Sequence, residues 1–164
     1  MSTYPLKRTR SLGIDYGIAR IGVAYSDESK IIASPMALIK TERKSEETLK
    51  KLLAFIKQHQ IELNYEIDVI IVGMPLMMSG KSGMMADEVK EFIVNLRASL
   101  PETKILDWDE RLSSVQADRS MIEAKFSRKK RAKYMDTVSA VIILQNYLDY
   151  NQFQKQMPPL PPIA

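Results

Sequence analysis

Three acidic residues that are far apart in the sequence stand where folding could bring their carboxylates together. Asp15 lies within a short apolar run, Glu110 follows another, and Asp136 comes at the start of the last long apolar segment. Carboxylate oxygens are hard ligands, and a set of them without His or Cys selects magnesium or manganese. Two such ions held by shared carboxylates can activate a water and stabilise the leaving oxygen of a phosphodiester. The three acids therefore indicate a candidate site for metal-assisted phosphodiester hydrolysis.

Asp15 is informative because of its neighbours. It interrupts residues 11–27, a stretch typical of a β-hairpin that turns near Gly17. An Asp in mid-strand costs stability unless it is paired or binds a cation. Gly13 and Gly22 remove side chains around it, which lets a ligand or a backbone approach closely. Two interpretations stay open from this stretch alone: a metal or phosphate site, and a hairpin with an exposed Asp beside a glycine turn.

A basic segment directly precedes Asp136. Residues 125–133 hold six Lys and Arg side chains and no acid, whereas the whole chain has a net charge of only +4. A basic patch on an otherwise near-neutral body indicates a polyanion partner, although a solvated loop would show the same composition. The residues of this segment that we expect to contact nucleic acid are Arg128, Lys129, Lys130, Arg131 and Lys133.

The apolar pattern predicts which elements position these residues. Three strands within residues 11–39 form an antiparallel meander, and Pro35 confines the third to a sheet edge or to one side of the ladder. A β-branched run at 67–73 predicts a central strand with parallel neighbours, and 104–110 predicts a short last strand. Helices are expected to begin with Ser45 as N-cap, at residues 82–83, at Ser113 and at Tyr134. The fold class is therefore α/β, with a mixed five-stranded sheet of three antiparallel and two parallel strands flanked by helices.

Length and composition indicate one domain over residues 1–150, followed by a proline-rich tail at 151–164 that we expect to be disordered. The chain has no cysteine, and its longest apolar stretch is too short to span a bilayer. We therefore expect a soluble cytoplasmic protein without a membrane partner. The single histidine, His59, falls on the polar side of the first helix and is interpreted as a surface residue.

Four motifs follow one another along residues 11–149. They are Leu-Gly-Ile-Asp-Tyr-Gly with Arg-Ile-Gly at 12–22, Ile-Val-Gly-x-Pro-Leu at 71–76, Asp-Glu-Arg-Leu at 109–112, and Met-Asp continuing to Gln at 135–145. Together they resemble the YqgF (RuvX-like) family. The resemblance implies an RNase H-like fold related to the Holliday-junction resolvase RuvC. It also implies a role as a nuclease that matures the 5′ end of pre-16S ribosomal RNA.

Carried over residue by residue, the resemblance places the catalytic and metal-binding acids at Asp15, Glu110 and Asp136, with Mg²⁺ or Mn²⁺ as the cofactor. Arg20 would face the substrate phosphate. Asp109 could take the place of Glu110, because a one-residue shift at a strand end redirects the side chain. The implied partner is structured RNA, with branched DNA as the other candidate, and both a monomer and a homodimer remain open.

Three other functions compete with a ribosomal RNA nuclease. A resolvase-like DNA nuclease would use the same acids, and an inactive RNA-binding module would need only the basic segment. The run Gly-Ile-Asp-Tyr-Gly at 13–17 also resembles the first phosphate loop of actin-like and sugar-kinase ATPases. Those folds need two such domains and a second Gly-Asp-Gly loop, which this chain lacks.

Overall fold

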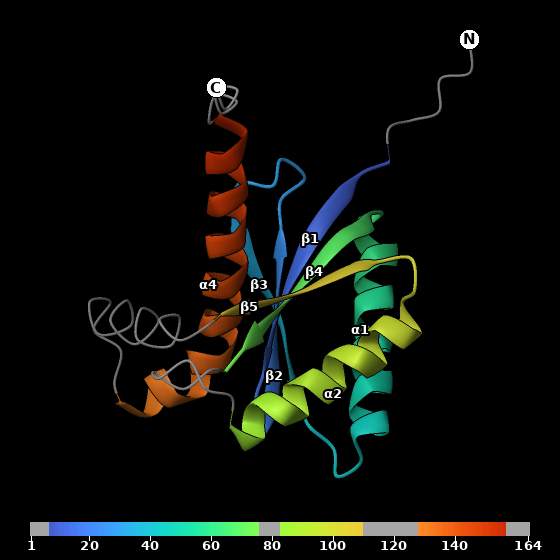
Figure 1. The fold of residues 1–164 in the computed structure, drawn as a ribbon, viewed down its shortest axis with the longest axis vertical. Coiled ribbons are helices and arrows are strands. Elements are labelled where there is room, and N and C mark those ends of the chain that lie inside the picture. Colours follow the sequence, from blue (N-terminus) through green and yellow to red (C-terminus); the bar gives the residue numbers. More distant parts are fainter. Residues whose placement is uncertain (1–6, 76–82, 110–127, 157–164) are drawn as a thin grey trace, which may run out of the picture.

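The computed structural model describes residues 7–75, 83–109 and 128–156, and the side chains of residues 128–137 also lie outside that description. Its sheet has the order β3-β2-β1-β4-β5. The strands are β1 (Thr9–Tyr16), β2 (Arg20–Ser26), β3 (Ala33–Lys40), β4 (Glu66–Met74) and β5 (Lys104–Asp109). The helices are α1 (Ser45–Leu63), α2 (Met84–Ser99) and α4 (Arg128–Gln156). Helix α4 covers one face of the sheet, whereas α1 and α2 lie on the other (Figure 1).

The strand pairing confirms the predicted mixed sheet. β2 pairs antiparallel with both β1 and β3, and β4 pairs parallel with both β1 and β5. Pro35 lies on the edge strand β3 as predicted, next to a register shift that leaves Met36 without a partner in β2. An edge strand with a bulge tolerates proline because the missing N–H donor is not needed by a second neighbour.

Each face of the sheet has its own apolar core. Leu12 and Ile14 of β1 pack with α1 and α2, whereas Ile71 of β4 packs with α4. Both faces of β4 are buried, since Ile70 and Ile71 are fully enclosed on opposite sides. This explains the continuous β-branched run of that strand.

Gly13 sets the distance between β1 and α4. A Cβ at this position would lie 2.7 Å from the Leu144 Cβ and 2.9 Å from the Ala140 carbonyl oxygen. Both distances are too short for real atoms, so any side chain here would push the helix away from the sheet. The glycine therefore fixes how closely α4 approaches the strand that carries Asp15.

Two predicted helix boundaries were wrong. Ser45 is the first residue of α1 rather than its N-cap, which is Lys44 and makes no side-chain capping hydrogen bond. The Thr48 hydroxyl instead accepts a hydrogen bond from the Glu42 backbone N–H at 2.8 Å, which ties the β3–α1 connection to the first turn. Helix α4 starts at Arg128, inside the basic segment, and not at Tyr134.

The C-terminal segment also differs from the expectation. Helix α4 continues to Gln156, so residues 151–156 of the expected disordered tail are helical. Residues 157–164 lie outside the described part, as does the helix predicted from Ser113. None of the described helices is both long enough and apolar enough to cross a bilayer.

His59 is half-buried, contrary to its interpretation as a surface residue. Its Nδ1 lies 2.7 Å from the Tyr65 hydroxyl, and its ring packs edge-on against Tyr25 with 4.8 Å between centroids. The Arg10 guanidinium lies 5.5 Å from both tyrosine ring centres. Burial lowers the pKa of His59, with a further lowering from Arg10. A neutral His59 therefore fastens α1 to the sheet.

Candidate catalytic site

Asp15 lies near the carboxyl end of β1, on the face of the sheet that α4 covers. Its neighbour Ile14 is buried towards α1 and α2, and Gly13 contacts α4. Side chains alternate between the two faces of a strand, so Asp15 shares the face of Gly13. The residue is half-buried, and β1 is held by a paired strand on each side. The carboxylate thus projects from a rigid central strand.

The positions beside Asp15 in both neighbouring strands are glycines. Gly22 of β2 is its register partner. In β4, Val72 pairs with Ile14, so the next residue, Gly73, falls beside Asp15 as the parallel register continues. Without side chains at these two positions, a cation and a phosphate can reach the carboxylate. Gly22 was expected beside Asp15 from the sequence, whereas the position of Gly73 follows only from the register of β1 and β4.

The segment of α4 that contains Asp136 lies at the same end of the sheet. The Gln145 side-chain amide accepts a hydrogen bond from the Ala33 N–H and donates one to the Ile31 carbonyl, which places Gln145 beside the start of β3. Ala140 lies opposite Gly13, so the helix runs antiparallel to β1. Asp136 comes about one turn before Ala140, in the direction of Asp15. Its side chain lies outside the described part.

The last strand places Asp109, one of the two candidates for the third acid. Leu106 and Trp108 of β5 pack against the core under α4. Asp109 follows Trp108 and pairs with Met74, which is buried towards α1 and α2. Asp109 therefore lies on the opposite face of the sheet from Asp15. Glu110 is outside the described residues, so the structure disfavours Asp109 without placing Glu110.

Arg20 is the first residue of β2, after a tight turn in which the Gly17 N–H donates to the Arg20 carbonyl oxygen at 2.9 Å. Its neighbour Ile21 is buried towards α1 and α2, so Arg20 shares the face of Asp15. The predicted nucleic-acid contacts of the basic segment have helical backbones in the first turns of α4; they are Arg128, Lys129, Lys130, Arg131 and Lys133. Their side chains are outside the described part.

The donor chemistry of Asp15 fits a hard divalent cation. Among the described side chains, no group of three or more His, Cys, Asp or Glu residues could hold a metal ion. Two of the three predicted ligands, Glu110 and Asp136, are not among those side chains. A carboxylate on a rigid strand, with glycines on both sides, is the part of a metal site that the described residues provide.

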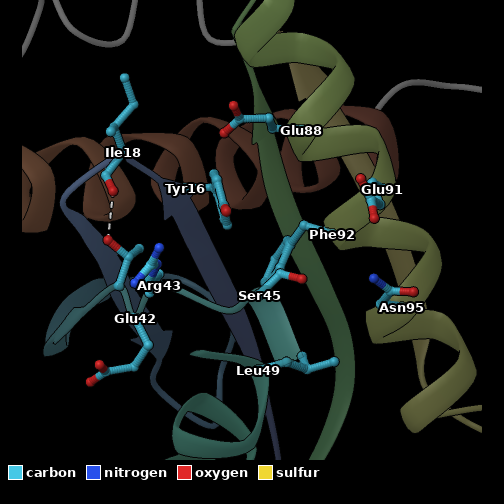
Figure 2. A pocket seen from close by; sticks show the side chains of 11 residues that line it. Tyr16, Ile18, Glu42, Arg43, Ser45, Leu49, Glu88, Glu91, Phe92 and Asn95 are labelled. Carbon is cyan, nitrogen blue, oxygen red and sulfur yellow. Dashed lines mark hydrogen bonds between the residues drawn. The ribbon is translucent and has the colours of Figure 1, made fainter. Parts of the chain in front are cut away.

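A separate cavity of about 310 Å³ lies on the other face of the sheet, beside Tyr16. Figure 2 shows Tyr16 and Phe92 with Glu88 and Glu91 of α2 on one side and Arg43 on the other. Burial raises the pKa of Tyr16, and the charges of Glu88 and Glu91 raise it further. Because these carboxylates would repel a phosphate, this cavity is not where a phosphodiester would be held. No sequence motif indicated the cavity, since its lining comes from separate elements.

Comparison with known proteins identifies a family that this chain resembles over most of its length. The family model described as "RuvX: Holliday junction resolvase" matches residues 9–150. A protein of Protochlamydia amoebophila named "Putative pre-16S rRNA nuclease" is 54% identical over 143 residues, which cover 87% of this chain and 95% of that protein. A protein of Halothermothrix orenii with the same name is 45% identical over 143 residues, covering 86% of this chain and 95% of that protein.

Among solved structures, Thermus thermophilus RuvC in complex with a Holliday junction substrate has a similar fold. Its TM-score is 0.52 at 12% sequence identity, with 88% of this chain and 96% of that chain covered. At this identity the likeness concerns the fold alone. It confirms the RNase H-like architecture expected from the motifs.

Proposed function

This chain belongs to the RuvX family, and on that premise we propose that it is a metal-dependent endonuclease that processes the 5′ end of pre-16S ribosomal RNA. The observation that carries the proposal is the position of Asp15, on the α4 face at the carboxyl end of β1, with Gly22 and Gly73 beside it. Ligand sites of such sheets lie beyond the carboxyl ends of the parallel strands. The names of the relatives support ribosomal RNA as the substrate.

Asp15, Glu110 and Asp136 are the residues that would hold Mg²⁺ or Mn²⁺. Such ions, when bound, supply an activated water and neutralise the charge that develops on the leaving oxygen. Asp15 contributes a carboxylate from a strand with little freedom to move, which keeps the ligand geometry fixed during the reaction. The close approach of α4 to β1 at Gly13 would keep Asp136 near Asp15.

Arg20 would contact a phosphate of the substrate from the same face. Its guanidinium offers paired N–H donors that match phosphate oxygens. The basic segment in the first turns of α4 would attract the polyanion and offset its repulsion by the three acids. Structured RNA is thus the proposed partner, and we place the activity in the cytoplasm.

A Holliday-junction resolvase activity is the second candidate, and the description of the matching family model favours it. The same acids would serve either substrate, because the chemistry at the scissile phosphate is the same. An inactive RNA-binding module is the third. The three candidate functions differ in the substrate: the first cuts RNA, the second cuts a DNA junction, and the third binds RNA without cutting it.

The test is a cleavage assay of the purified chain in Mg²⁺ or Mn²⁺ and in EDTA. The substrates are an RNA that spans the mature 5′ end of 16S ribosomal RNA, a four-way DNA junction, and a linear DNA duplex of the same sequence. We expect cleavage of the RNA at the mature end, and none in EDTA. Cleavage of the junction alone would replace the proposal by the resolvase activity. Binding of RNA without any cleavage would establish the inactive module.

A further inference from the structure

Two basic side chains face each other across β2 and β3 at the same end of the sheet as Asp15. Arg20 is the register partner of Lys40. The residues beside them, Ile21 and Ile39, are partners too, and both are buried towards α1 and α2. Alternation along the strands therefore places Arg20 and Lys40 together on the α4 face. Arg20 is half-buried there, and Lys40 is exposed.

Like charges directly opposite on adjacent strands destabilise a sheet unless an anion lies between them. Among the residues that the structure describes, Lys40 makes no ion pair. The charge of Lys40 does lower the pKa of Glu42, after the larger effect of Lys51. The Glu42 carboxylate pairs with the Lys51 ammonium, however. As far as the described side chains go, the Lys40 ammonium thus remains available to an anion from outside the chain.

Hydrogen bonds hold the backbone around this pair in place. The Thr41 N–H donates to the Ala19 carbonyl oxygen at 3.0 Å, and the Thr41 hydroxyl donates to the Ile18 carbonyl oxygen. The end of β3 is thereby attached to the β1–β2 turn, so Lys40 and Arg20 keep their relative position. A site whose backbone is already ordered loses less entropy when an anion binds.

Arg20 and Lys40 lie on the first and second strands beside the strand that carries Asp15. Gly22 is the partner of Asp15, and Leu38 is the partner of Gly22. Arg20 and Lys40 lie two residues beyond Gly22 and Leu38, which is about 7 Å along the strands. With about 4.8 Å between neighbouring strands, their Cα atoms lie roughly 8 Å and 12 Å from that of Asp15. If one phosphate of a nucleic acid lies at Asp15, the next phosphate along the same nucleic-acid chain would therefore be within reach of both cations.

We infer that Lys40 and Arg20 together bind the phosphate next to the scissile one, and that Lys40 is a nucleic-acid-binding residue of this chain. The inference rests on the proposed function, because it places the scissile phosphate at Asp15. It gives the nucleic acid a path over the sheet, from the Asp15 carboxylate, past Gly22, to the edge strand β3. The cavity beside Tyr16, on the other face, plays no part in this path.

The experiment measures binding of a fluorescently labelled single-stranded RNA over a series of salt concentrations in EDTA, which prevents metal-dependent cleavage. The variants are Lys40→Gln, the charge-preserving Lys40→Arg, and Lys50→Gln as a matched control. Lys50 is also exposed, but it belongs to α1 on the other face. Circular dichroism and melting curves establish that each variant is folded.

We expect Lys40→Gln to reduce the slope of log affinity against log salt by about 0.7, the contribution of one single-strand phosphate contact. Between 50 and 200 mM salt, the affinity of this variant would then fall roughly 2.5-fold less than that of the wild type. Lys40→Arg and Lys50→Gln should keep the wild-type slope. An unchanged slope in Lys40→Gln, or an equal loss in Lys50→Gln, would overturn the inference.

The outcomes separate this inference from the proposed function. If the purified chain cuts no RNA but Lys40→Gln still lowers the salt slope, the phosphate site stands and the nuclease activity does not. If the chain cuts RNA and the slope is unaffected by Lys40→Gln, the nuclease stands and the strand follows another path from Asp15.

Discussion

Replacing Gly13 by alanine tests whether the close approach of α4 holds the candidate site together. The new Cβ would lie 2.7 Å from the Leu144 Cβ and 2.9 Å from the Ala140 carbonyl oxygen, so the helix must move away from β1. Overpacking of this kind costs about 1–3 kcal/mol. Alanine also restricts the unfolded chain, which returns about 0.4–1 kcal/mol. Taking about 2 kcal/mol for the overpacking, the middle of its range, we expect a net loss of roughly 1–2 kcal/mol in the free energy of unfolding.

Urea unfolding followed by circular dichroism measures this loss directly. The melting temperature should fall by about 2–8 °C, since 1 kcal/mol corresponds to about 2–4 °C for a chain of this size. The displaced helix carries Asp136, so cleavage should fall further than the population of folded protein does. A Gly13→Ala protein as stable as the wild type would show that the contact with α4 is not tight.

A double variant with Leu144→Ala sharpens the result. Leu144 is fully buried, so Leu144→Ala alone should cost about 2–5 kcal/mol through the cavity that it leaves. The atoms that the new methyl group meets, the Leu144 Cβ and the Ala140 oxygen, remain after this truncation. The two losses should therefore add. A double variant much more stable than that sum would mean that α4 relaxes through the Leu144 side chain.

The remaining predictions concern a pH effect, a helix start and the basic segment. His59 has a lowered pKa in the folded state, so wild-type stability should fall as the pH drops below about 6.5, by at most about 1.4 kcal/mol per pH unit. Urea unfolding of His59→Gln should lack this component, and an unaltered pH profile would refute it. Thr48→Val leaves the Glu42 N–H without its acceptor and should cost about 1–2 kcal/mol on urea unfolding; no measurable loss would contradict that role. Changing the four basic residues at 128–131 to Gln should reduce the slope of log affinity against log salt for RNA binding by up to about 2.8, at about 0.7 per single-strand phosphate contact. An equal slope would make this segment a solvated helix start.

The sheet was predictable because its patterns are strong and local. The β-branched run of β4 indicated burial on both faces, and Pro35 was compatible with an edge strand. The start of α4 was not predictable from the apolar pattern. The basic residues from Arg128 interrupt the apolar period, although lysine and arginine favour helices. His59 was misplaced for a similar reason. Its partners Tyr25 and Tyr65 lie outside α1, so the apolar periodicity of that helix gives no information about them.

Asp15 and its neighbour Gly22 were identifiable from the sequence, since an acid among apolar strand residues has few explanations, but Gly73 was not. The pairing of Arg20 with Lys40 was not, because it depends on the register of β2 and β3 and on the bulge near Pro35. The face of Asp109 likewise follows only from its pairing with Met74. Residues that are distant in sequence acquire a common face only once the strand register is known.

The most direct test of the central claim compares Asp15→Asn with Asp109→Asn in single-turnover cleavage of the pre-16S RNA substrate in Mg²⁺. Asp109 is an exposed acid on the opposite face of the sheet, so Asp109→Asn is a matched change of charge. We expect Asp15→Asn to abolish cleavage and Asp109→Asn to retain it. In EDTA, the Asp15→Asn protein should melt at the wild-type temperature or slightly above, because the proposed site would then hold two like charges in place of three. Wild-type cleavage by Asp15→Asn would contradict the account.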